Sequence, residues 1–342
     1  MNRIGEYWNT LGQRLEAATA GMDTIEDFSG IATEALTALP APRMTAAEIA
    51  EWVIEEGKVP PQVNYYSSFG DPPLVVYSTP KFYIEALFWF PSSTAIHGHA
   101  FTGAFVVLDG FSIETRYLFH SEREIEDGVL QGRLVPREVE FIGPGKVCSI
   151  LGADSYVHAV AHMGNPSITL VVRTYGSRVH RQYRYHRCGL ATCSNLNKNE
   201  IPRQAAVLLA VRRAAPADFL PTLERFLRHA NVHTFYGVLE VLMRSLPAPM
   251  YRDELLPFVE ARFGETRGEV LAGIREILRG KALWAGARNM PGAHGELQVA
   301  LAEFLPDPVE RDAVLRSSYG ENYHQLPAKW REMVVASVKG TA

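Results

Sequence analysis

The stretch Ile96-His97-Gly98-His99-Ala100-Phe101-Thr102-Gly103 places two histidines two positions apart, and the apolar run Ala104 to Leu108 follows it directly. In an extended strand successive side chains point to opposite faces, so His97 and His99 lie on the same face. Neutral imidazole nitrogen is a ligand for iron, copper, zinc or nickel. The stretch therefore predicts half of a metal site, which one or two ligands from a distant strand would complete. We expect His158 to be such a ligand.

The bulk composition is that of a globular protein, with 342 residues, 47% of them apolar and 21% charged. This length predicts two or three structural units. The net charge of −4 gives no reason to expect nucleic acid or an anionic membrane as a partner. Three cysteines are too few for a disulfide scaffold, which favours reduced thiols and a cytoplasmic protein. The sequence also lacks the apolar run of a signal peptide and any stretch of ~18 uncharged apolar residues that would span a membrane.

The first part of the chain, residues 1–61, is predicted to be a helical segment. Apolar residues recur at helical spacing near its start, and Thr45-Ala46-Ala47-Glu48 is typical of the capping box that opens a helix. Gly57 and the pair Pro60-Pro61 end this pattern.

Residues 62–190 have the pattern of short strands separated by Gly, Pro and Asp turns, with no helical pattern between them. This favours an antiparallel sandwich or barrel. We expect the charged segment Ser121 to Asp127 to be a loop or a hairpin tip. The predicted strands are Lys81–Phe90, the two-histidine stretch, Ile113–Phe119, Val139–Ile142, Val147–Leu151 and Ile168–Tyr175.

Residues 200–342 return to helical apolar stripes and are predicted to form a C-terminal all-helical domain. This domain could be a surface for homo-oligomer formation, a lid or a separate binding module, and the sequence does not choose among them. The predicted helices are Ala205–Ala214, Phe219–Leu246, Asp253–Phe263, Glu269–Leu283, Glu296–Phe304 and Trp330–Val338.

A second histidine-bearing segment follows the first at some distance, with Gly143-Pro144-Gly145, a strand, and then Ser155-Tyr156-Val157-His158. Together with His-x-His and the turn glycine Gly110, this order resembles the two motifs of the cupin superfamily. The resemblance covers about 62–178 and implies an α+β protein with a double-stranded β-helix (jelly-roll) barrel. The first motif usually carries a carboxylate four or five residues after its second histidine, where this chain has Gly103 and Ala104.

The missing carboxylate directs the resemblance to the three-histidine branch, and the thiol dioxygenases are the nearest family in that branch. It implies an Fe(II) site, or one for another divalent metal, at His97, His99 and His158. Tyr175 falls where that family has an active-site tyrosine, and Trp89 and Tyr65-Tyr66 lie upstream of the first motif as its aromatic residues do.

Several positions depart from that family. The cysteine expected after the first motif is replaced by Gly103 or Ala104, and the histidine two positions before the tyrosine is replaced by Arg173. The arginine that binds the substrate carboxylate is absent near Tyr65-Tyr66-Ser67-Ser68. The asparagine four positions after the ligand histidine is His162 here. These departures affect the substrate more than the fold or the ligands.

Three residues besides the ligands are candidates for the reaction. Arg173 and Tyr175 share a face of their strand, where Arg173 could bind a substrate carboxylate and Tyr175 could hydrogen-bond dioxygen or substrate. The alternative for Arg173 is an ion pair with a surface acid. His162 could be an outer-shell residue, an acid–base group, a fourth ligand or a purely structural histidine.

The segment 178–193 interleaves basic residues with tyrosines and contains His180, His186, Cys188 and Cys193. Single-stranded nucleic acid binding and a zinc site are two readings, but the spacing matches no familiar zinc pattern. An edge strand protected by basic side chains is the favoured interpretation.

Taken together, the sequence predicts a non-haem iron(II) dioxygenase of cupin type that acts with O2 on a small polar substrate, a carboxylate-bearing thiol or amino acid derivative. The alternatives are another metal-dependent cupin reaction, such as carbon–carbon cleavage or isomerisation, and a cupin that binds a small ligand without turnover and signals through its helical domain.

Overall fold

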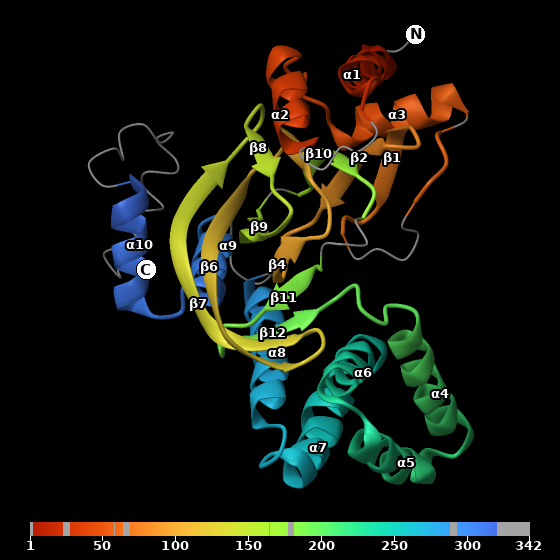
Figure 1. Cartoon of the computed structure of the whole chain (residues 1–342), viewed down its shortest axis with the longest axis vertical. Coiled ribbons are helices and arrows are strands. Elements are labelled where there is room, and N and C mark those ends of the chain that lie inside the picture. The colour runs from red at the N-terminus through yellow and green to blue at the C-terminus, as the bar shows by residue number, and fades with distance from the viewer. Residues whose placement is uncertain are drawn as a thin grey trace. The chain divides into compact units, whose positions relative to one another are not determined.

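The chain forms two compact units (Figure 1). The computed structural model describes residues 3–22, 28–57, 59–63, 69–163, 165–176, 181–287 and 293–319. The first unit comprises Met1–Leu118, Pro136–His180 and Leu283–Ala342, and the second comprises Phe119–Val135 and Arg181–Ala282. The boundaries expected at 61, 190 and 200 stay predictions. Among the helices so described, none combines the length and apolar character needed to cross a membrane.

One sheet of the first unit has its strands in the order β1-β2-β10-β5-β8, with every pairing antiparallel. On β2, β5 and β10 the even-numbered side chains pack against the N-terminal helices, whereas Leu87, Phe105, Val107 and Val171 pack together in the barrel interior. The strands are β1 (Pro73–Ser78), β2 (Phe82–Trp89), β5 (Gly103–Asp109), β8 (Val147–Ile150) and β10 (Ser167–Thr174).

The other wall of the barrel is built on β9 (Ala153–His162), which pairs antiparallel with β3 (Ser92–Ser93), β4 (Ile96–His99) and β6 (Ser112–Glu126). Tyr156 and Val160 of β9 join the interior cluster. On the outside, Ile113 of β6 packs against α9 (Ala293–Phe304) and α10 (Pro308–Tyr319). The predicted α+β fold, an antiparallel β-barrel with helices before and after it, is confirmed.

Three N-terminal helices cover the first sheet, α1 (Arg3–Thr19), α2 (Phe28–Ala38) and α3 (Ala46–Glu56). The predicted capping box is present, since the Thr45 hydroxyl accepts from the Glu48 N–H and the Glu48 carboxylate accepts from the Thr45 N–H. Gly57 ends α3 with φ 66°, a left-handed conformation that glycine adopts without steric cost.

The second unit combines helices with the short strands β11 (Tyr183–Tyr185) and β12 (Leu190–Cys193), and β12 pairs with β7 (Val129–Ile142). The single helix predicted over Phe219–Leu246 is two helices, because the Asn231 side chain accepts from the Thr234 N–H and caps a new one. The helices are α4 (Glu200–Ala214), α5 (Pro216–His229), α6 (Val232–Ser245), a π-helical turn (Met250–Leu255), α7 (Leu256–Phe263) and α8 (Gly268–Ala287). The predicted helix Trp330–Val338 lies outside the described residues.

The prediction of a loop or hairpin tip over Ser121 to Asp127 is wrong for most of that segment. Strand β6 continues through Glu126, and the chain turns only at Asp127 and Gly128, where Gly128 has φ 79°. Charged side chains do not prevent strand formation when they point to solvent, and Glu122, Arg123 and Glu124 are exposed.

Candidate metal centre

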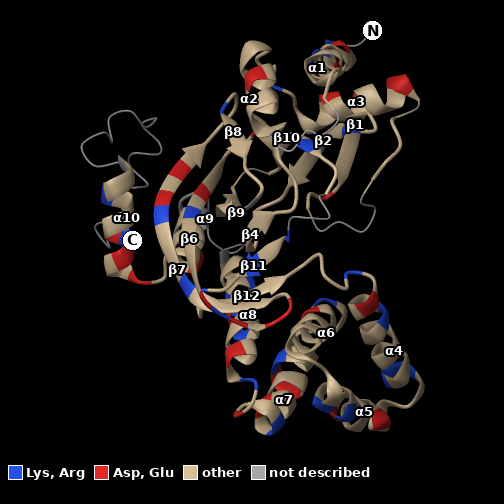
Figure 2. Ribbon diagram, viewed as in Figure 1, with Lys and Arg blue, Asp and Glu red and all other residues tan. Residues whose placement is uncertain are grey.

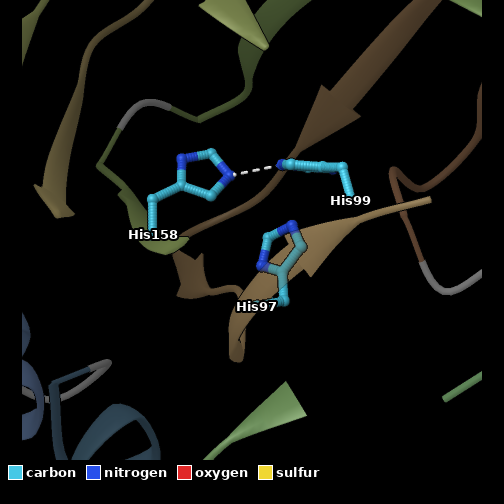
Figure 3. Close-up of side chains that lie close together, drawn as sticks. All are labelled: His97, His99 and His158. Carbon is cyan, nitrogen blue, oxygen red and sulfur yellow. Dashed lines mark hydrogen bonds between the residues drawn. The ribbon is translucent and has the colours of Figure 1, made fainter. Parts of the chain in front are cut away.

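His97, His99 and His158 meet in the interior of the first unit (Figure 3). Strands β4 and β9 bring them together, since His97 and His158 are paired in the antiparallel register. One ring nitrogen from each lies within 4.8 Å of the others, and each residue is at most 4% exposed. The structure thus places the predicted third histidine beside the pair from the first motif.

Hydrogen bonds show that Nδ1 carries a proton in two of these rings. The Nδ1 atom of His97 lies 2.8 Å from the carbonyl oxygen of Ala95, and the Nδ1 atom of His158 lies 2.6 Å from a carboxylate oxygen of Glu114. A carbonyl or carboxylate oxygen only accepts, so each Nδ1 donates. In the neutral tautomer the opposite nitrogen, Nε2, then has a free lone pair, as a metal ligand requires.

The third ring also suits a metal. Burial lowers the pKa of His99 well below its usual range, so the neutral form of the ring is favoured. Positive charge on His97 or His158, when either ring is protonated, and the charge of Arg173 act in the same direction. Its Nε2 atom lies 2.9 Å from Nε2 of His158. Two nitrogen ligands about 2.1 Å from one ion and at right angles would be about 3.0 Å apart. The three residues therefore offer a divalent metal the right type of donor, and the spacing of His99 and His158 suits a shared ion.

The neighbouring strand leaves no room for a side chain at position 103, where the chain has Gly103. A Cβ atom at that position would lie 2.0 Å from the carbonyl oxygen of Val172 on the neighbouring strand β10. Ala104 is buried on the opposite side of the sheet, among the residues that contact the N-terminal helices. Neither position can therefore supply the carboxylate or cysteine of related motifs.

Glu114 is the principal residue that the sequence reasoning missed. It is fully buried on β6 and accepts hydrogen bonds from His158, from the Tyr156 hydroxyl and from Arg116. Burial acts to raise the pKa of Glu114, but the hydrogen bond and charge of His158, the charge of Arg116 and the Tyr156 hydroxyl hold it at about 2. The sequence does contain one indication of this position. Side chains alternate between the two faces of a strand, so Glu114 and Arg116 lie on the face opposite Ile113.

Arg173 faces the barrel interior, as its strand alternation with Val171 requires. Its guanidinium lies 3.3 Å from the centre of the Phe101 ring, and that ring contacts His99 at a centroid distance of 4.7 Å. One of its terminal nitrogens lies 3.3 Å from the carboxylate of Glu85, whose pKa is raised because burial outweighs the charge of Arg173. The partner acid is thus buried rather than on the surface.

Tyr175 lies just after β10, with its side chain 38% exposed. Its hydroxyl donates to the carbonyl oxygen of Thr79 at 2.9 Å, and its ring packs on Tyr83 at a centroid distance of 5.0 Å. The Tyr83 ring also contacts the guanidinium of Arg173. The structure therefore brings Tyr175 near Arg173 through Tyr83 and engages its hydroxyl with the backbone; its role in a reaction stays a prediction.

His162 ends strand β9, four residues after His158. It stacks flat on Trp89, with ring centroids 4.2 Å apart, and its Nδ1 atom lies 2.9 Å from the Ser112 hydroxyl. Burial and the charge of His158 lower the pKa of His162 to about 3, which keeps the ring neutral. Its Nε2 atom is buried without a hydrogen-bond partner among the described residues. The upstream residues Tyr65-Tyr66 lie outside the described part of the chain.

The basic segment after β10 is only partly described, since residues 177–180, including His180, lie outside the described ranges. His186 is buried and bonds the Tyr236 hydroxyl at 2.9 Å, Cys193 is buried and Cys188 is exposed. Among the residues with described positions, these three do not form a metal-sized group. The Arg184 guanidinium pairs with Glu240.

The buried His186 predicts an acid-sensitive second unit. Burial, together with the charge of Arg184, lowers the pKa of His186 to about 3. The unfolded chain binds a proton at this residue below its usual pKa of ~6.5, so stability is full above that pH and falls as the pH drops toward 3. Between pH 7 and pH 5 the loss attributable to His186 is expected to reach about 2 kcal/mol.

The measurement is the opening free energy of α6 by hydrogen exchange at both pH values. The variant His186→Phe is expected to show a pH dependence smaller by that amount, and a matched change at the exposed His229, His229→Phe, is expected to leave it unaltered. Equal pH dependence in wild type and His186→Phe would contradict the assignment.

Comparisons with known proteins give likeness in fold only. No family model matches the sequence, and no curated protein is similar to it. Hydroquinone 1,2-dioxygenase PnpCD in complex with Cd2+ and 4-hydroxybenzonitrile is 15% identical over 32% of this chain and 68% of its own, with a TM-score of 0.24. The DMSP lyase DddQ from Ruegeria pomeroyi is 14% identical over 53% and 96%, with a TM-score of 0.28. A sugar phosphate isomerase of the cupin superfamily from Silicibacter pomeroyi is 15% identical over 36% and 76%, with a TM-score of 0.23.

Proposed function

We propose that the chain is a metal-dependent oxidoreductase that binds Fe(II) through His97, His99 and His158 and acts with O2 on a small polar substrate. The observation that carries the proposal is the convergence of three buried imidazoles with their ligand nitrogens within 4.8 Å. Three ligands on one side of an ion leave other positions for substrate and dioxygen. When bound, iron(II) would supply the redox chemistry that dioxygen needs, and the protein residues would bind, orient and exclude water.

Arg173 is proposed to bind a carboxylate of the substrate. Its only ion pair among the described residues is the single contact with Glu85, and its Nε–H is buried without a partner. A guanidinium has five N–H donors, so enough remain for a two-point contact with a carboxylate. The Phe101 ring holds the guanidinium in place and removes water from one face of it.

His162 is proposed to contact a polar group of the substrate or dioxygen through Nε2. Stacking on Trp89 and the bond to Ser112 hold its ring in one orientation. The neutral ring can donate or accept one hydrogen bond at that atom, according to its tautomer. Tyr175 would act from the Tyr83 side of the site, close to Arg173.

The test is metal analysis of protein purified without oxygen, followed by oxygen-electrode assays of the iron-loaded protein with a panel of thiols and amino acids. We expect about one metal ion per chain and iron-dependent oxygen uptake with one substrate class. Failure to bind any divalent metal would refute the site. Metal binding without oxygen uptake would refute the oxygenase reaction and support an isomerase or a ligand-binding protein. Self-association through the helical segment and a cytoplasmic location stay predictions.

A further inference from the structure

The carboxylate of Glu114 is surrounded by hydrogen-bond donors. Its Oε1 atom accepts from Nδ1 of His158 at 2.6 Å and from the Tyr156 hydroxyl. Its Oε2 atom accepts from Nε of Arg116 at 3.0 Å, and a terminal nitrogen of Arg116 forms an ion pair with it at 2.9 Å. Three hydrogen bonds and an ion pair thus surround one carboxylate. Glu114 is therefore held as a fixed acceptor in the barrel wall.

The position of this acceptor determines what His158 can do. Because Oε1 is an acceptor, Nδ1 of His158 carries the proton, and the lone pair is on Nε2 beside His99. A carboxylate behind a ligand histidine fixes the ring orientation and makes the opposite nitrogen more basic toward a metal. The Tyr156 hydroxyl donates to the same Oε1 atom as His158. It therefore weakens the hydrogen bond that Oε1 accepts from His158.

Arg116 connects this arrangement to the exterior of the barrel. Its guanidinium contacts Glu138 and Glu140, both at 3.3 Å, and Glu140 pairs with Lys146. Acidic and basic positions lie along the ribbons of β6 and β7, the strands that carry Arg116, Glu138 and Glu140 (Figure 2). Arg116 thus remains in an acidic environment even if Glu114 is made neutral, which allows Glu114 to be varied separately.

We propose that Glu114 is a positioning residue that holds His158 in the metal-binding tautomer, and that Tyr156 moderates this effect by sharing the same carboxylate oxygen. The inference rests on the proposed metal site at the three histidines. It assigns opposite effects on metal affinity to two residues that are not themselves metal ligands. Loss of the Glu114 acceptor weakens metal binding, whereas loss of the Tyr156 donor leaves Oε1 to His158 alone and maintains or strengthens it.

The experiment measures the affinity for Co2+, used as a spectroscopic probe, in the full chain and four variants. Glu114→Gln keeps the size of the side chain but removes the obligatory acceptor, and Glu114→Asp keeps the charge but shortens the reach. Tyr156→Phe removes the competing donor. Glu140→Gln, which removes a charge from the same network without touching a histidine, is the matched control. Imidazole nitrogen resonances of the zinc-loaded protein report the His158 tautomer directly.

We expect Glu114→Gln and Glu114→Asp each to lower Co2+ affinity by about 10- to 100-fold and to alter the visible spectrum of bound Co2+. Tyr156→Phe is expected to bind Co2+ at least as tightly as wild type, with the Nδ1 proton of His158 retained. Glu140→Gln is expected to match wild type.

The proposal would be overturned by wild-type affinity in Glu114→Gln, or by a loss in Tyr156→Phe as large as that in Glu114→Gln. Retained affinity in Glu114→Asp would show that charge alone acts, which also contradicts positioning. If circular dichroism shows that Glu114→Gln does not fold, the Co2+ affinity of Tyr156→Phe and the His158 nitrogen resonances still test the proposal. Absence of Co2+ and Zn2+ binding in the wild type refutes the metal site itself, an outcome distinct from the failure of Glu114.

Discussion

The variant His97→Ala is expected to lose metal affinity by more than the about 10- to 100-fold that removal of an outer-shell partner gives. Two ligands remain after the change, His99 and His158, whose Nε2 atoms lie 2.9 Å apart. His97 is replaced rather than His158 because the described hydrogen bond of its Nδ1 goes to a backbone carbonyl, that of Ala95, which water can satisfy. Isothermal titration of the metal-free protein with Co2+ measures the loss.

The matched control is His162→Gln, which can keep the bond to Ser112. His162 is as buried as the three ligands and lies on the same strand as His158, yet it is not a member of the metal-sized group. Stoichiometric metal in His162→Gln together with its loss in His97→Ala would support a three-histidine site. Loss of metal in both variants would make His162 a fourth ligand, and retention in both would place the metal elsewhere.

The histidine site could be predicted because its information is local. Two-residue periodicity puts His97 and His99 on one face, and the second glycine-rich motif identifies the strand that carries His158. Glu114 could not be predicted in the same way, since its contact with His158 joins residues 44 positions apart and depends on the antiparallel register of β6 with β9. A one-residue slip of that register would turn Glu114 out of the interior.

The substrate-side residues show the same limit. Alternation predicts which face of its strand Arg173 lies on, but the identity of its partner Glu85 follows from the pairing of β2 with β10. Among the helices, the break at Asn231 was missed because a continuous apolar stripe runs through it, and only the cap marks the new start. The helix α10 was also missed, although its Leu315 is fully buried against the outer face of the barrel.

The variant Arg116→Met is expected to lower the free energy of unfolding of the metal-free first unit by about 3 kcal/mol. It removes the guanidinium from a fully buried carboxylate and leaves Glu114 with only the donors Tyr156 and His158. The value is at the lower end for a broken buried pair because the Arg116 side chain is 33% exposed and partly screened. The four tryptophans that the structure describes all belong to the first unit, so urea unfolding followed by tryptophan fluorescence reports on it.

The double variant Glu114→Leu with Arg116→Met separates the buried charge from lost packing. If the uncompensated carboxylate is the cause, the double variant is less destabilised than Arg116→Met alone, although it lacks both partners. The control Arg3→Met breaks an exposed pair with Glu48, in which the side chains are 61% and 38% exposed, and is expected to change the free energy of unfolding far less than Arg116→Met does. Equal effects of Arg116→Met and Arg3→Met would mean that Glu114 does not require a cation in the folded protein. A double variant as unstable as the sum of its single changes would mean that packing, rather than charge, connects Arg116 to the wall that carries His158.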